Sequence, residues 1–223
     1  MEPVPYARLV GSLMYAQVCI HVDMLFRFQS DPGHKHWTAG KKVLRYLQRT
    51  KSHMLVYKRV KKLELVGFTD SDFAGNYLAS MKFTCGYVYM LAGGEVAWKT
   101  MKQSLIATST MQAEIIAIYE GVCEGLWIRS FLLETKILSN LADGKLKVYC
   151  DNEAAVFFSK NSKRSNNSKH IDFKFYSIRK RVKDGEIEIA SISTDAQLAD
   201  PLPRHYQFQF SRSMLKTWEF SLV

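Results

Sequence analysis

A change in the hydrophobic pattern near residue 63 constrains the fold of this chain more than any other sequence feature. Short runs rich in aromatic and branched residues follow one another there, separated by turn-prone stretches, which is typical of β-strands. The predicted strands are residues 63–68, 86–91 and 95–98. Ala92, Gly93 and Gly94 separate the last two and predict a tight hairpin turn. Three hairpin-connected strands therefore open the main folded part of the chain.

The pattern then changes to alternating helices and strands. A long amphipathic helix is expected to begin at Ser109 or Thr110, where Ser109 and Gln112 have the spacing of a capping box. The further expected elements are a strand at 146–150, helices at 152–160 and 173–183, a strand at 187–192, and a helix within the tail at 207–222. This order predicts an α/β (α+β mixed) sheet covered by helices, but leaves the order of its strands open.

Residues 1–58 form a separate helical segment in this interpretation. The second of two expected helices is the clearer one, because Asp31 can cap it and Pro32 suits its first helical position. A chain of 223 residues is long enough for one good-sized domain and a smaller attachment. We therefore expect a helical segment at 1–58 and the main domain at 59–223.

Four carboxylates lie beside these predicted elements: Asp70, Glu114, Asp151 and Asp200. Asp70 closes the first strand, and Asp151 follows a later one, at the edge where open α/β sheets bind ligands. Clustered oxygen donors suit Mg²⁺ or Mn²⁺. Two such ions about 3.5–4 Å apart can stabilise an in-line displacement at phosphorus. One such acid is usually a cap or a solvated charge, so the interpretation depends on all four together.

Local motifs connect these acids to a known family. The motifs are TDSDFAG at 69–75, GYV at 86–88, WKTMKQS at 98–104, ATSTMQAE at 107–114, YCDNEAA at 149–155, KHID at 169–172 and QLADPL at 197–202. In this order they resemble the ribonuclease H domain of copia-type LTR retrotransposon Pol polyproteins. The stretch from YARLVGSL at 6–13 to Tyr57 resembles the segment that joins reverse transcriptase to that domain. The resemblance therefore covers nearly the whole chain.

The resemblance implies a fold and a chemistry. The fold is a ribonuclease H-like five-stranded mixed sheet flanked by helices, after a small helical N-terminal segment. The activity is metal-dependent hydrolysis of RNA in RNA–DNA hybrids. In this family the acids that match Asp70, Glu114, Asp151 and Asp200 are catalytic and hold two ions, Mg²⁺ or Mn²⁺.

The stretch 160–183 is the most basic part of the chain and is the candidate nucleic-acid contact. The candidate residues are Lys160, Lys163, Arg164, Lys169, His170, Lys174 and Arg179. Cations beside a carboxylate site suit a phosphate backbone, and the interleaved Phe173, Phe175 and Tyr176 can stack on bases or sugars. The alternative is a solvated helix face with its rings in the core, and the two interpretations are compatible.

Departures from the family pattern keep a second function open. Gln112 stands where the family usually has Glu, Ile115 where it has Tyr, and Tyr176 where it has His. The segment around 19–28 is shorter by about one helical turn, roughly four residues. The alternative is therefore a catalytically weak or inactive nucleic-acid-binding remnant of a transposon polyprotein. A third interpretation is a partner-binding module built from residues 1–58.

Composition limits the partners and the compartment. The net charge of +10 indicates a polyanionic partner or non-specific adhesion. No apolar run reaches the ~20 residues that span a bilayer, and residues 1–3 do not resemble a signal sequence. The four cysteines form no paired framework. We expect an intracellular protein, cytoplasmic or nuclear and neither secreted nor membrane-bound, whose oligomeric state the sequence leaves open.

Overall fold

The protein divides into two compact units. A computed structural model describes residues 6, 33–72, 83–135, 144–161, 169–200 and 220–222. The first unit takes in Met1–Met54 and two short C-terminal stretches, and the second takes in Leu55–Arg204 and Arg212–Phe220. Our division at residue 58 stays a prediction.

The first unit contains one described helix and most of a small sheet. Helix α2 (His34–Thr50) confirms the helical character predicted for this segment, and strands β1 (His53–Leu55) and β7 (Phe220–Leu222) pair with each other. The expected tail helix is wrong for its last residues, because β7 pairs with β1 as a strand. The earlier part of that tail and the proposed caps of α2 lie outside the described residues.

The second unit is built on a five-stranded mixed sheet. Its strands are β2 (Leu65–Asp72), β3 (Thr84–Leu91), β4 (Gly94–Lys102), β5 (Leu146–Cys150) and β6 (Ile187–Ser191). The spatial order is β4-β3-β2-β5-β6. The β4–β3 and β3–β2 pairs are antiparallel, whereas the β2–β5 and β5–β6 pairs are parallel. The predicted mixed sheet is confirmed.

Strand β2 extends beyond its predicted end. We placed Asp70 at the close of this strand, but the antiparallel ladder with β3 continues through Asp70 and Ser71 to Asp72. On its other side, β2 pairs with β5 only as far as Phe68. The last residues of β2 therefore lie beyond the parallel ladder, next to the point where β5 ends.

The hairpin between β3 and β4 is the tight turn that the sequence predicts. Leu91 pairs with Gly94, which leaves Ala92 and Gly93 as the two loop residues. Both have positive φ, 55° and 81°. This is the backbone that a two-residue turn with φ > 0 at both positions requires.

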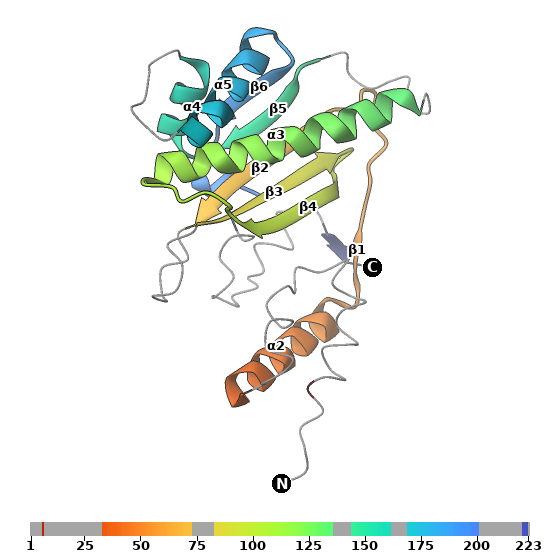
Figure 1. The fold of residues 1–223 in the computed structure, drawn as a ribbon. Helices are drawn as coiled ribbons and strands as arrows, with labels where there is room; N and C mark the ends of the chain where they lie inside the picture. The colour runs from red at the N-terminus through yellow and green to blue at the C-terminus, as the bar shows by residue number, and fades with distance from the viewer. Residues whose placement is uncertain are drawn as a thin grey trace. The chain divides into compact units, whose positions relative to one another are not determined.

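Three helices cover one face of the sheet region (Figure 1): α3 (Thr110–Glu134), α4 (Glu153–Lys160) and α5 (Lys169–Lys183). A short 3₁₀ turn, η2 (Thr194–Ala196), follows β6. Helix α3 packs against β2, β3 and β5, and α4 and α5 pack beside it. Leu65, Tyr89, Val148 and Ile189 contribute sheet residues to the buried core beneath these helices.

Helix α3 differs in two ways from its prediction. Ser109 is its N-cap and accepts a hydrogen bond from the amide of Gln112 (3.2 Å), but the side chain of Gln112 accepts from Thr108 and not from Ser109. The helix is also not amphipathic along its first half, because every residue from 112 to 118 is buried. A second small cluster packs Phe83 and Ala107 with Ala113 and Ile116 of α3, so the helix has buried contacts beyond the main core.

Within the part of the chain that the structure describes, no helix is long and apolar enough to cross a membrane.

The close approach of α3 to the sheet yields a test of this packing. A Cβ added at Gly125 would lie 2.7 Å from Leu146 Cδ2 and would also overlap the Tyr89 hydroxyl. We expect Gly125→Ala to destabilise the protein by about 1–3 kcal/mol through overpacking, although alanine favours helix by about 1 kcal/mol. Urea unfolding measures the change. Cys123→Ala, at an exposed position of the same helix, is the control, and a Gly125→Ala variant as stable as the wild type would contradict this packing.

Candidate metal and nucleic-acid site

The candidate site begins with the buried carboxylate of Glu114. This residue lies on α3 and is 4% exposed. Its Oε1 accepts two hydrogen bonds from Ser71, one from the backbone amide (3.0 Å) and one from the hydroxyl (2.7 Å). Helix α3 is thereby connected to the part of β2 that extends beyond the parallel ladder.

The end of β5 adds a second carboxylate to this place. Asp151 follows the last residue of β5, and its oxygen lies within 4.8 Å of ligand atoms of Glu114 and Cys150. The Cys150 thiol is 3.5 Å from Glu114 Oε2, and the hydroxyl of Thr194 donates to Asp151 Oδ2 (3.1 Å). We call Glu114, Cys150 and Asp151 the acidic group.

Asp70 and Asp200 lie in neighbouring segments of the chain. Among the described residues, neither belongs to the acidic group. Asp70 is buried in β2, one residue before Ser71. Gln197 donates to the carbonyl oxygen of Thr69 (3.0 Å), which holds the 197–200 segment against β2. Asp200 at the end of that segment is half-buried. Two ions about 3.5–4 Å apart need ligands spread over a larger region than the three residues of the acidic group occupy.

Burial sets the electrostatics of the acidic group. It raises the pKa of Glu114 to about 7, against the opposing effect of the two Ser71 hydrogen bonds, and the charge of Asp151 adds to the increase. Burial also raises the pKa of the Cys150 thiol. This cysteine therefore keeps its proton and donates it toward Glu114.

The donor set fits a hard divalent cation. Glu114 and Asp151 offer carboxylate oxygens, which Mg²⁺ and Mn²⁺ prefer. The protonated thiol of Cys150 is a poor ligand for these ions, and a thiolate is what a soft ion would require. Oxygen ligation by the two acids is the arrangement that this chemistry supports.

The predicted nucleic-acid residues occupy different environments. Lys160 is exposed at the end of α4, whereas Lys163 and Arg164 lie outside the described residues. Lys169 and His170 lie in the first turn of α5, and the structure does not describe their side chains.

Two further members of that set make internal contacts. Lys174 forms an ion pair with Glu120 of α3 and lies 4.3 Å from the centre of the Tyr119 ring. Arg179 donates to the Phe158 carbonyl oxygen (2.8 Å) and lies over the Phe175 ring. Both connect α5 to neighbouring helices, and their nucleic-acid role stays a prediction.

Sequence reasoning missed the residues that hold the acids in place: Ser71, Cys150, Thr194 and Gln197. Ser71, Cys150 and Gln197 belong to the quoted motifs, and this membership is the signal that could have selected them. Their bonds join residues far apart in the sequence, so the pairings themselves needed the fold.

The aromatic residues of α5 divide between the two interpretations of the sequence. Phe175 is buried in the core, whereas Phe173 and Tyr176 are 64% and 67% exposed. The exposed rings share a face of α5 with Lys180. The basic helix thus has both a core side and an exposed side of rings and cations.

Comparison with known proteins finds transposon relatives over most of the chain. The chain is 38% identical over 210 residues to the "Retrovirus-related Pol polyprotein from transposon TNT 1-94" of Nicotiana tabacum, a match that covers 92% of this chain and 15% of the tobacco protein. It is 39% identical over 142 residues to "Secreted RxLR effector protein 161" of Plasmopara viticola, covering 61% of this chain and 99% of the effector. The chain thus spans only a small part of the polyprotein it matches. No family model matches the chain.

Among solved structures, the chain is similar to LC11-RNase H1, determined in complex with an RNA/DNA hybrid. The sequence identity is 17% and the TM-score is 0.44. The match covers 64% of this chain and 95% of the other.

The raised pKa of Glu114 predicts a pH-dependent stability. A folded-state pKa above the ordinary 4.5 means that the folded protein binds this proton more tightly than the unfolded chain. The stabilisation is complete below the unfolded pKa and is lost as the pH rises through about 7. Without divalent ions, the free energy of unfolding should therefore fall by on the order of 2–3 kcal/mol between acid and mildly alkaline pH.

Glu114→Gln should remove this part of the pH dependence, because glutamine keeps an acceptor for Ser71 but carries no charge. Urea unfolding across the pH range measures it, with exposed Glu153→Gln as the matched control. Added Mg²⁺ should stabilise the wild type at alkaline pH and leave Glu114→Gln unchanged. Parallel pH curves for the wild type and Glu114→Gln would contradict the burial of this charge.

Proposed function

Because the chain belongs to the family of retrovirus-related Pol polyproteins of transposons, we propose that it is the ribonuclease H part of such a polyprotein. Its substrate is the RNA strand of an RNA–DNA hybrid, which it hydrolyses with Mg²⁺ or Mn²⁺. The observation that carries the proposal is the meeting of Glu114 and Asp151 from separate family motifs within one small group.

The proposed site uses oxygen ligands from four places in the chain. Glu114 and Asp151 would hold the ions from inside the acidic group, and Asp70 and Asp200 would complete the ligand set from the adjoining backbone. When bound, two divalent ions lower the pKa of an attacking water and stabilise the charge that develops on the phosphate. No side chain is needed as a nucleophile.

The residues around the acids orient them for this role. Ser71 fixes one oxygen of Glu114 and leaves Oε2 directed toward Cys150 and Asp151. Thr194 engages one oxygen of Asp151 and leaves the other available. Gln197 connects the Asp200 segment to Thr69, next to Asp70. These contacts give Glu114 and Asp151 defined orientations, as partners of metal-binding carboxylates commonly do.

We propose that the exposed side of α5 and the end of α4 meet the nucleic acid. Lys160 is exposed there, and the Phe173 and Tyr176 rings are available for stacking. Lys174 and Arg179, which bind groups within the protein, would act by holding α5 in place.

A cleavage assay tests the proposal. With Mn²⁺, the purified full chain should degrade the labelled RNA of a hybrid, and Asp151→Asn or Asp70→Asn should lower the rate by a factor of about 100 or more. Asp184→Asn, an exposed acid after α5, is the control and should cleave at the wild-type rate. Equal cleavage by all four proteins would assign the activity to a contaminant or to another site.

The same assay separates the second candidate function, a remnant that binds without cutting. The observation that favours it is the position of Asp70 and Asp200 outside the three-residue group. A remnant would retain salt-dependent binding of the hybrid and show no metal-dependent cleavage under any divalent ion.

A further inference from the structure

A hollow of about 290 Å³ lies where β2 and β5 begin, at the end of these strands opposite the acidic group. Leu65 opens β2 and Leu146 opens β5, whereas Ser71 and Asp151 lie at the other ends of these parallel strands. The hollow is lined by Lys62, Glu64, Leu65, Arg129, Gly144, Lys145, Leu146, Lys147 and Glu188. We call it the basic hollow. The proposed catalytic chemistry uses none of its residues.

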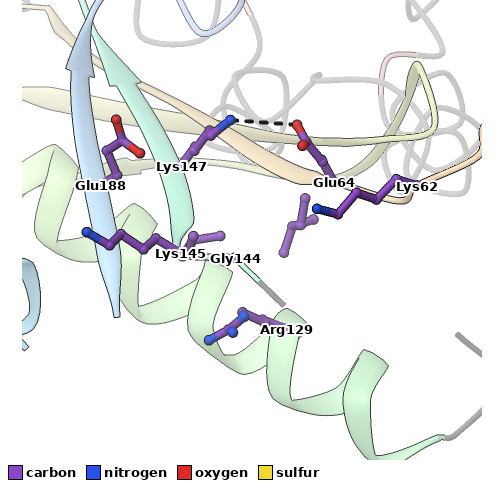
Figure 2. Close-up of a pocket in the computed structure, with 9 residues that line it drawn as sticks. Lys62, Glu64, Arg129, Gly144, Lys145, Lys147 and Glu188 are labelled. Atoms are coloured by element: carbon purple, nitrogen blue, oxygen red, sulfur yellow. Dashed lines mark ion pairs between the residues drawn. The ribbon is translucent and has the colours of Figure 1, made fainter. Parts of the chain in front are cut away.

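Three separate segments contribute cationic residues to the lining of the basic hollow (Figure 2). Lys62 comes from the segment before β2, Arg129 from α3, and Lys145 and Lys147 from the start of β5. Because these cations come from distant parts of the chain, the arrangement differs from a run of solvated charges along one helix. Four cations face two carboxylates, so the lining has an excess of positive charge.

Among the described residues, three of these four cations have no ion-pair partner. Lys147 pairs with Glu64 at 3.8 Å, with side chains 43% and 51% exposed, which makes a weak surface pair. Toward the other residues that the structure describes, Lys62, Arg129 and Lys145 form no ion pair. Like charges around one concave surface repel each other, and a bound anion would relieve that repulsion.

The shape and floor of the basic hollow limit the anion. Leu65 and Leu146 are buried and supply apolar contact. The volume is near the lower end of the range for small-molecule sites, about 300–1,000 Å³. It admits a phosphate group with its sugar and excludes a duplex. The guanidinium of Arg129 offers the paired donors that match phosphate oxygens.

The segment that leads into the basic hollow extends the positive surface. Lys58, Arg59, Lys61 and Lys62 are all exposed and precede β2. A row of cations ending in a concave site suits a ligand with repeated charges more than a single small anion. An extended polyanion can contact the row and insert one of its groups into the hollow.

We propose that the basic hollow binds a phosphate group of a nucleic-acid single strand, at a site separate from the acidic group. This inference rests on the proposed function in one respect: the proposed substrate is a nucleic acid, and its phosphodiester strands supply the polyanion. A nucleic acid bound both there and at the acidic group would contact the protein at the two ends of β2 and β5.

Binding measured in EDTA tests this inference without any contribution from divalent ions at the acidic group. The probe is a short fluorescein-labelled oligo-dT, followed by fluorescence anisotropy over a range of salt. Each lost phosphate contact lowers the salt slope by about 0.7 for single strands, so Arg129→Gln/Lys145→Gln should lower it by about 1.4 and weaken binding. Because EDTA removes divalent ions and oligo-dT contains no RNA to cleave, this test is independent of the proposed cleavage.

Control variants define the outcomes. Lys99→Gln removes one exposed charge on β4, away from the basic hollow, and should leave the slope unchanged. Lys145→Arg should restore binding that Lys145→Gln loses, and thermal melting checks that each variant is folded. The inference is overturned if the double variant keeps the wild-type slope, or if Lys99→Gln weakens binding as much. It also fails if inorganic phosphate or poly-glutamate raises the melting temperature while oligo-dT does not bind.

Discussion

The buried carboxylate of Glu114, held by Ser71, is the interaction on which the rest of the site depends. A carboxylate removed from water is costly unless donors replace the lost hydration. Ser71 supplies two donors from one residue, and they can reach Glu114 only if α3 crosses the sheet close to β2. The glycines at 121 and 125 allow that approach, since they face Thr69 and Tyr89 with no side chain between.

The elements that the sequence predicted well are those whose local pattern and tertiary environment agree. Strand β5 begins and ends where its alternating residues predict, and α3 starts at the Ser109 cap. Strand β2 was predicted too short because its last residues are polar, and the ladder with β3 holds them in the sheet. The first half of α3 was predicted to be amphipathic because nothing local reveals the second small cluster, which buries Ala113 and Ile116.

In the candidate site, too, the features with a local sequence signal were predicted and those that depend on tertiary contacts were not. Motif order indicated Glu114 and Asp151, which the fold brings together. The bonds from Ser71, Thr194 and Gln197 were not predictable, because each depends on the packing of segments that are distant in sequence. The basic stretch was identified as a charge pattern, but composition alone could not show that Lys174 pairs with Glu120 inside the protein.

The parallel pairing of β2 with β5 has a consequence for how the molecule assembles. Strands β2, β3 and β4 are close to one another in sequence, whereas the β2–β5 ladder joins Phe68 to Tyr149 across the whole intervening chain. Contacts of such long sequence separation form slowly, because loop closure must come first. Glu114 is therefore synthesised before its partner at residue 151. An incomplete chain that stops before β5 carries only one of the two carboxylates of the acidic group, so the proposed metal site can form only late in synthesis.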